Sequence, residues 1–497
     1  MKQYEHIVNK LSGGLPRKDA DRIENFFTVL DGRIDLPMVR KNELIEHFYR
    51  AFEYYTDHGY SVERIVNLMD PDNLGDFYRH NERQYISLDN AAIVYPLGMK
   101  FGQMPLFRLS ANLRDEIVPE ILQLALDFTM KRFPSFSAVI KSGIFWHYLE
   151  TTNNIHQVEP ENDIPCKPIS IILRSFKSFR VLYYKKRISI EYFHAITDGS
   201  GGMTFLKTLL AEYFRLLGKR IGYGTDVLDI NEEVDPAELV NEFNNTTAAK
   251  DLNTFLDKSS LQLDGKLTRV NINRIIHFEL NGEEVLKRAH KYSGTVTAYM
   301  LAILFIASNR CMSRKDGVIN IQVPVNMRKF NGSKTLRNYS MYFSASMKPE
   351  EIGDLKSMVK EMRRQIVEKG DESLMNQMMA TTGNLIKMID RVPMIMKTPV
   401  IQLAYGYLGN RIIAMTLSNL GNIEVPERMK NLIESFDFII APTRPNRAAC
   451  ALVSYDGKMR LTVSKATKDD SFENEIYDLL KEEGLSITVE GSEEYES

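Results

Sequence analysis

A short segment of the chain brings together an imidazole, a carboxylate and a run of glycines. His194 is followed four residues later by Asp198, and Gly199 comes directly after that aspartate. An imidazole has an unperturbed pKa of about 6.5, so it can accept a proton from an alcohol or an amine near neutral pH. The carboxylate can fix the turn that orients the ring, and glycines let a substrate approach the backbone closely. This pattern predicts a general base at His194, with Asp198 as a structural support.

The sequence on either side indicates which elements hold this segment. Residues 181–184 and 188–193 flank a basic turn, which predicts a hairpin whose second strand ends at His194. Residues 199–202 (Gly-Ser-Gly-Gly) interrupt regular structure, and within residues 203–217 apolar side chains recur at helical spacing. The motif is therefore expected between a strand end and a helix N-terminus. A core histidine followed by a glycine turn is the alternative, and the motif alone leaves it open.

Other catalytic patterns fit the sequence poorly. No His-Glu-x-x-His pair, Walker loop or Gly-x-Gly-x-x-Gly string occurs, so we expect no metal site and no permanently bound cofactor. Ser200 lacks the Gly-x-Ser-x-Gly context of a nucleophile and is interpreted as a turn residue. Cys311 or Cys450 could serve as a nucleophile beside a histidine, but isolated cysteines in apolar surroundings are usually inert.

Composition limits the partners and the compartment. The 63 basic and 65 acidic side chains leave a net charge of -2, which excludes a global field that would attract nucleic acid. A small, mostly neutral partner fits this balance. The three cysteines are widely spaced, which predicts no disulfide framework and favours the cytoplasm. The apolar stretch 393–408 is interrupted by Lys397 and Pro399 and is too short for a membrane span, so no transmembrane segment is expected.

The chain divides by pattern into four parts. Residues 1–80 carry apolar side chains at helical spacing and predict a helical N-terminal extension. A strand followed by a helix then occurs twice, which predicts an αβ half over 81–220 and another over 266–497. Residues 221–265 are polar and rich in Asn, Asp and Glu, as a linker would be. The expected class is mixed α/β.

The segment from His194 to Gly199 resembles the His-x-x-x-Asp-Gly motif of the CoA-dependent acyltransferase superfamily, and the alcohol acetyltransferase branch is the most similar. This superfamily includes chloramphenicol acetyltransferase and the condensation domains of peptide synthetases. Residues 323–328 (Val-Pro-Val-Asn-Met-Arg) are similar to its Pro-x-x-x-Arg element, and 333–339 and 416–421 extend the likeness. The resemblance covers roughly residues 85 to 485. It implies two chloramphenicol-acetyltransferase-like sandwich halves that form a pseudo-dimer around a central tunnel.

The resemblance also implies roles for particular residues. His194 would be the catalytic base, and Asp198 would form an ion pair with Arg328 across the halves. Ser418 and Asn419 would be candidates for contacts with the oxyanion or the substrate, although Ser and Asn also favour turns at strand ends. Acyl-CoA would be the co-substrate, and a small alcohol or amine the acceptor.

Three functions follow from this likeness. The first is transfer of an acetyl or other short acyl group from CoA to an alcohol, by direct attack and without an acyl-enzyme. The second is a stand-alone condensation-type enzyme that takes its acyl group from an acyl carrier protein and forms an amide. The third is a non-catalytic relative that binds an acyl ligand, which the retention of His194 and Asp198 disfavours.

Overall fold

A hairpin leads directly into His194, as its sequence predicts. In the computed structural model, β8 (Phe179–Tyr184) pairs antiparallel with β9 (Arg187–Phe193), and His194 follows the second strand. Lys185, in the turn, has a φ of 50°. The structure describes residues 3–79, 85–89, 92–93, 95, 104–152, 154–169, 171–172, 175–245, 259–404, 411–443 and 446–495.

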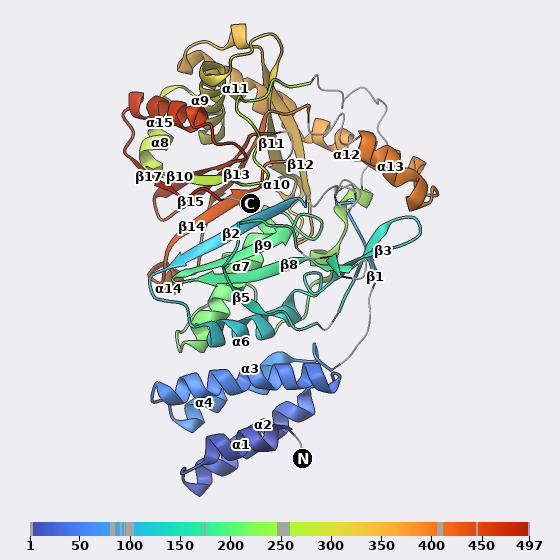
Figure 1. Cartoon of the computed structure of the whole chain (residues 1–497), viewed down its shortest axis with the longest axis vertical. Helices are drawn as coiled ribbons and strands as arrows, with labels where there is room; N and C mark the ends of the chain where they lie inside the picture. Colours follow the sequence, from blue (N-terminus) through green and yellow to red (C-terminus); the bar gives the residue numbers. More distant parts are fainter. Residues whose placement is uncertain are drawn as a thin grey trace.

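The hairpin belongs to a five-stranded sheet with the order β14-β2-β9-β8-β5. Its other strands are β2 (Leu106–Leu113), β5 (Val158–Pro160) and β14 (Ile433–Ile440). Helices α6 (Pro119–Thr129) and α7 (Gly199–Leu216) pack on one another against this sheet (Figure 1). Strand β14 comes from the second half of the chain and pairs antiparallel with β2. The first half therefore completes its sheet with a strand from the second half.

A second sheet of seven strands forms the C-terminal half, in the order β12-β11-β13-β15-β16-β10-β17. Its strands are β10 (Arg274–Asn281), β11 (Ile319–Asn326), β12 (Ser340–Met347), β13 (Met415–Asn422), β15 (Ala448–Tyr455), β16 (Lys458–Lys465) and β17 (Ile487–Gly491). The helices of this half are α8 (Gly282–Lys291), α9 (Val296–Cys311), α11 (Leu355–Lys369), α12 (Glu372–Met388), α13 (Met394–Ala404) and α15 (Ser471–Glu482). Most of α9 is buried, which explains why its sequence is apolar on all sides.

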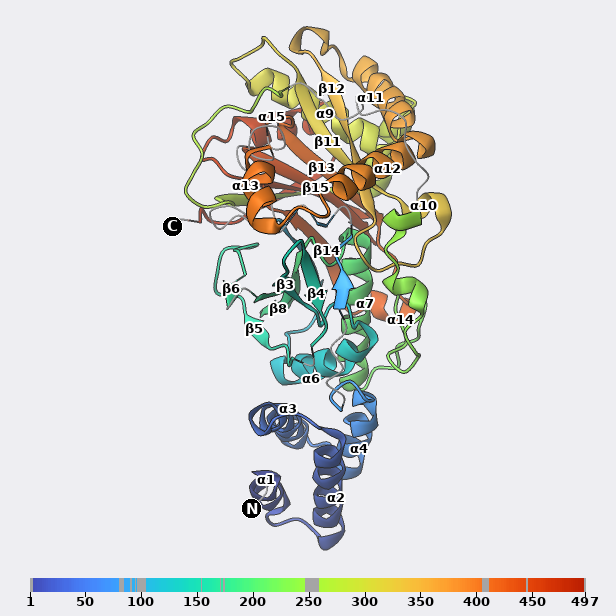
Figure 2. The ribbon, with the colours of Figure 1, turned by 90° about the vertical axis from the view of Figure 1, so that its right-hand side faces the viewer.

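The N-terminal extension is helical, as predicted, and is built from α1 (Gln3–Ser12), α2 (Arg17–Arg33), α3 (Met38–Asp57) and α4 (Val62–Leu68). These helices lie at the end of the molecule beside α6 (Figures 1 and 2). The rings of Phe48 and Phe128 lie 5.8 Å apart, and His47 Nδ1 is 2.7 Å from Asp127 Oδ2. Because these contacts join α3 to α6, the extension and the first half share one apolar core.

Shorter elements complete the fold. A small sheet has the order β1-β4-β3-β7-β6. Its strands are β1 (Tyr85–Ser87), β3 (Val139–Ser142), β4 (His147–Glu150), β6 (Ile171–Ile172) and β7 (Ser175–Lys177). The one-turn helices are α10 (Arg328–Asn331), α14 (Glu427–Lys430), η1 (Pro71–Leu74), η2 (Met130–Arg132), η3 (Pro236–Leu239), η4 (Glu242–Asn245) and η6 (Pro349–Glu351).

Within the described residues, no helix is both long and apolar enough to cross a membrane. Residues 246–258 of the predicted linker and 405–408 of the apolar stretch lie outside the described residues. The division into 1–80, 81–220, 221–265 and 266–497 and the central tunnel stay predictions.

Candidate active site

His194 lies where β9 ends, between two aromatic rings. Its backbone N–H donates to the carbonyl oxygen of Pro105 at 3.0 Å, which fixes the chain as it leaves the sheet. The ring centroids of Tyr95 and Phe107 lie 5.2 and 5.1 Å from that of the imidazole. These neighbours limit the ring to a narrow range of orientations and remove much of its water.

The environment keeps the imidazole neutral at pH 7. Burial lowers the pKa of His194 because the charged form loses hydration, and the nearby charge of Asp198 only partly offsets this effect. The pKa therefore lies below the usual value for histidine. A neutral ring has a free lone pair, which a general base requires.

Asn338 anchors His194 from the C-terminal half. Its Nδ2 donates to the His194 carbonyl oxygen at 2.9 Å and lies 3.1 Å from the ring Nδ1. Its Oδ1 accepts from the hydroxyl of Ser340 at 2.9 Å, which orients the amide. In the sequence, Asn338 lies within the run 333–339, whose resemblance to the superfamily predicts no role for it. A polar residue 144 positions away carries no local signal for such a contact.

The Asp198 carboxylate binds the N-terminus of α7 with one oxygen and the second half of the chain with the other. Its Oδ1 accepts the N–H groups of Ser200 and Gly201, both at 3.1 Å, and thereby caps α7. Its Oδ2 accepts the N–H of Tyr339 at 2.8 Å. Burial alone would raise the pKa of Asp198, but the Arg328 guanidinium and these N–H donors outweigh it and lower the pKa. The carboxylate is ionised and has the contacts of a structural group.

The ion pair expected between Asp198 and Arg328 is present. Arg328 Nη1 lies 2.7 Å from Asp198 Oδ2, and both side chains are largely buried. Its Nε donates to the Thr335 carbonyl at 2.8 Å and its Nη2 to the Arg337 carbonyl at 2.6 Å. Only a guanidinium offers several donors in one rigid plane, so lysine could not make these contacts together.

The segment 335–340 holds the whole motif through successive residues. The Thr197 hydroxyl donates to the Leu336 carbonyl at 2.7 Å. Arg337 Nη2 lies 2.8 Å from Asp89, which ties in residues of the first half next to β1. Together with the contacts of Asn338 and Tyr339, these interactions join the two halves of the protein next to His194.

Close packing explains the glycines after Asp198. A Cβ at Gly201 would collide with the backbone oxygen of Leu336 and with the Thr197 hydroxyl. A Cβ at Gly199 would lie 2.6 Å from the Leu420 Cδ2, a side-chain end that can move. The glycines thus permit close approach of α7 to the other half, in addition to any effect on substrate access.

Ser418 and Asn419 lie on opposite faces of β13. Leu420 approaches Gly199, but the register of β13 against β15 shifts between Asn419 and Asn422, so strand alternation does not extend from Ser418 to Leu420. Asn419 points to the side opposite Ser418, where its Nδ2 donates to the Thr297 hydroxyl at 3.1 Å and its Oδ1 accepts the Gly421 N–H at 2.8 Å. Because the Asn419 amide is already bound to Thr297 and Gly421, Ser418 is the better candidate of the two for contact with a substrate.

The other candidate nucleophiles are two thiols with raised pKa values and Ser200, whose N–H donates to Asp198 within this site. Cys450 is buried, and burial raises the thiol pKa of both Cys450 and Cys311, the latter to about 12. The Ser200 hydroxyl accepts from the Asn326 amide at 2.9 Å. Among the described residues, no group of three or more His, Cys, Asp and Glu side chains is placed to hold a metal ion.

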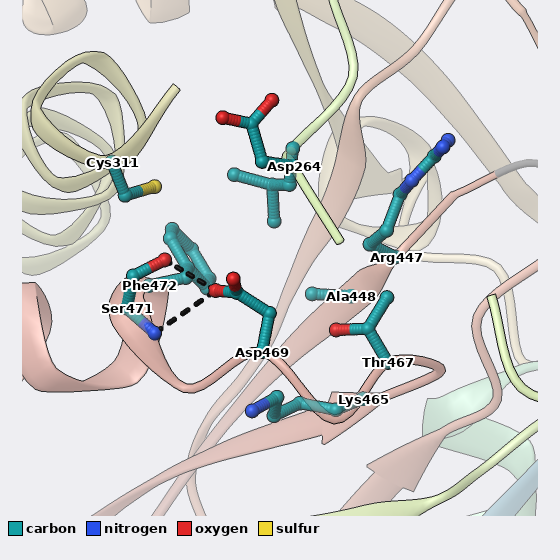
Figure 3. Close-up of a pocket in the computed structure, with 10 residues that line it drawn as sticks. Asp264, Cys311, Arg447, Ala448, Lys465, Thr467, Asp469, Ser471 and Phe472 are labelled. Atoms are coloured by element: carbon teal, nitrogen blue, oxygen red, sulfur yellow. Dashed lines mark hydrogen bonds between the residues drawn. The ribbon is translucent and has the colours of Figure 1, made fainter. Parts of the chain in front are cut away.

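A small pocket in the C-terminal half contains none of the predicted site residues. It is lined by Asp264, Cys311, Lys465, Asp469 and Phe472 among others, and Ser471 donates to Asp469 in its wall (Figure 3). It leaves room for little more than one water molecule. It is too small for an acyl acceptor, and its cysteine is the protonated Cys311.

Comparisons with known proteins identify the fold. No family profile and no curated protein sequence matches this chain. Among solved structures, it is similar to TRI3 trichothecene 15-O-acetyltransferase from Fusarium sporotrichioides, with a TM-score of 0.55 and 12% identity over 81% of this chain and 94% of that one.

Two further structures have the same fold. F. sporotrichioides TRI101 complexed with coenzyme A and T-2 gives a TM-score of 0.53 and 11% identity over 82% of this chain and 99% of that one. The starter condensation domain of rhizomide synthetase RzmA, in complex with C8-CoA and Leu-SNAC, gives a TM-score of 0.51. Its sequence identity is 10%, over 80% of this chain and 93% of that one. The chain therefore has the two-half, mixed α/β fold of the CoA-dependent acyltransferases.

Proposed function

We propose that this chain transfers an acyl group, acetyl or another short chain, from a CoA thioester to the hydroxyl of an alcohol. The observation that carries the proposal is the neutral, oriented imidazole of His194 at the junction of the two halves. The fold supports it, because structures that share it include acetyltransferases and a complex with coenzyme A. The cytoplasm is the proposed compartment.

The proposed base is Nε2 of His194. The His194 backbone favours a proton on the ring, and we assign that proton to Nδ1, in which case the Asn338 Nδ2 group, itself a donor, bonds only the His194 carbonyl. When Nδ1–H donates to that carbonyl, Nε2 keeps its lone pair. Nε2 takes the proton of the acceptor hydroxyl while the oxygen attacks the thioester carbon. The tetrahedral intermediate then collapses, the C–S bond breaks, and the imidazolium returns the proton to the sulfur.

Three further side chains are assigned supporting roles. Asp198 and Arg328 hold the histidine turn against the second half through their ion pair. Ser418 is the proposed donor to the oxyanion, because the neighbouring candidate, Asn419, has its amide bound to Thr297 and Gly421. A positioned oxyanion donor contributes about 10²–10³ in rate.

The test is release of free thiol from acyl-CoA in the presence of a panel of alcohols. Loss of a general base costs about 10²–10⁴ in rate, so His194→Ala should lose that much while keeping its fold by circular dichroism. His290→Ala removes an exposed histidine and should retain full activity. Thiol release that is equal in the wild type and His194→Ala would refute the proposal and favour a ligand-binding role.

Amide formation from a carrier-protein thioester is the second candidate function. It is favoured by the likeness to a starter condensation domain solved with C8-CoA and Leu-SNAC. The same assay, run with amines as acceptors and with acyl groups loaded on a carrier protein, distinguishes amide formation from transfer to an alcohol. Turnover with CoA and alcohols only would exclude it.

A further inference from the structure

Two segments from different halves of the chain meet at one projecting tip. The turn of the β3–β4 hairpin and the α12–α13 pair extend to the same side of the molecule (Figure 1), and both face the viewer in Figure 2. The Met394 N–H donates to the Ile144 carbonyl at 2.8 Å, and Trp146 Nε1 donates to Asp390. Lys397 Nζ lies 3.0 Å from the centroid of the Trp146 ring. These contacts make the two segments one surface.

This tip carries large apolar side chains that water surrounds. Its apolar residues, which are between 44% and 85% exposed, are Ile144, Phe145, Met388, Ile395 and Met396. Single exposed apolar residues are common on protein surfaces, but a cluster of them marks a surface that binds a partner or a membrane. The early methionines of the same region, Met375 and Met379, are instead buried in the core.

The charges beside these residues are almost all positive. Segments 139–147 and 386–398 together contain four lysines or arginines and a single acid, Asp390, which accepts from Trp146. Two of these cations are already engaged, since Lys397 is buried against Trp146 and Lys141 pairs with Glu150. Lys387 and Arg391 are exposed; Lys387 precedes Met388 directly, and Arg391 lies between Met388 and Ile395 in the sequence. Cations around an apolar tip complement the phosphates of an anionic lipid surface, whereas the whole chain has a net charge of only -2.

We propose that this tip inserts into the surface of a membrane that contains anionic phospholipid. The apolar side chains enter the region between headgroups and acyl chains, and Lys387 and Arg391 stay at the phosphates. A protein partner fits less well, since a standard interface takes about 20–30 residues from each side. A projecting tip with five exposed apolar side chains offers less than that. The proposal is independent of the acyl-transfer chemistry.

The test is co-sedimentation of the full chain with phosphatidylcholine vesicles, with and without phosphatidylserine. We expect binding to the mixed vesicles that weakens at high salt. Phe145→Ser/Ile395→Ser/Met396→Ser should reduce the binding constant at least tenfold. The matched control is Met38→Ser/Val39→Ser/Val367→Ser, which removes exposed apolar residues elsewhere and should bind as the wild type does.

Charge is tested separately. Lys387→Gln/Arg391→Gln should weaken binding about fivefold for each cation removed, and Arg17→Gln/Lys18→Gln, at an exposed site in the N-terminal extension, should not. Absence of vesicle binding, or equal loss in the control variants, would overturn the proposal. So would a dimer in analytical ultracentrifugation that the triple variant dissociates, because a second copy would then be the occupant.

Discussion

Arg328 Nη1 lies 2.7 Å from Asp198 Oδ2, and this contact joins the second half of the chain to the turn that follows His194. His194 and Asp198 are four residues apart, yet the carboxylate is bound to the N-terminus of α7 and to Arg328 and Tyr339. The carboxylate thus fixes the backbone turn that carries the His194 side chain.

Removal of either member of this pair should lower both stability and activity. Leaving one buried charge unpaired costs about 3–5 kcal/mol, so Asp198→Ala and Arg328→Ala should each lose that much in the free energy of unfolding by denaturant titration. Arg328→Lys should restore little of the lost stability, because lysine cannot also donate hydrogen bonds to the Thr335 and Arg337 carbonyl oxygens. Arg314→Ala, in an exposed pair with Asp316, should change stability by less than about 0.5 kcal/mol.

The pH dependence of thiol release should reflect the lowered pKa of His194. The base must be neutral, and burial places its pKa below 6.5, so kcat/KM should stay level through neutral pH and fall only on the acid side of that value. Asp198→Asn removes the charge that raises this pKa and should move the acid limb to still lower pH. An acid limb above pH 7 in the wild-type enzyme would contradict the neutral histidine.

Asn338 is expected to act as a positioning residue. Asn338→Ala removes the donor to the His194 carbonyl, and a small misplacement of the base should lower kcat about 10- to 100-fold with little change in KM for acyl-CoA. Asn338→Asp keeps the shape but adds a negative charge beside the ring. It should raise the pKa of His194 and shift the acid limb to higher pH, a change that a merely structural role would not produce.

Gly201 should tolerate no side chain. Gly201→Ala places a Cβ against the Leu336 backbone and Thr197, which should destabilise the fold by about 1–3 kcal/mol in denaturant titration. Gly199→Ala meets only the movable end of Leu420 and should cost less. Gly222 has open space around it, so Gly222→Ala is the control and should unfold at the wild-type denaturant concentration.

Local patterns predicted the local parts of the site. Alternation and helical spacing placed His194 between β9 and α7, and the Asp198–Arg328 contact followed from a resemblance in two short motifs. Asn338 was not assigned, because an amide that binds a histidine 144 residues away looks like any polar residue at a strand start. Ser418 and Asn419 were proposed together, because their sequence also fits a turn, and only the strand β13 and the contact of Asn419 with Thr297 separate the two side chains.

The insertion of β14 limits how this chain can be divided. If the two halves were produced as separate polypeptides split in the linker, the first would display the unpaired edge of β2, and the second an orphaned strand. Open edges of this kind promote aggregation. Folding of either fragment would then require strand complementation by the other, and chimeras that exchange one half between distant relatives would succeed only if the donor strand fits the recipient's edge.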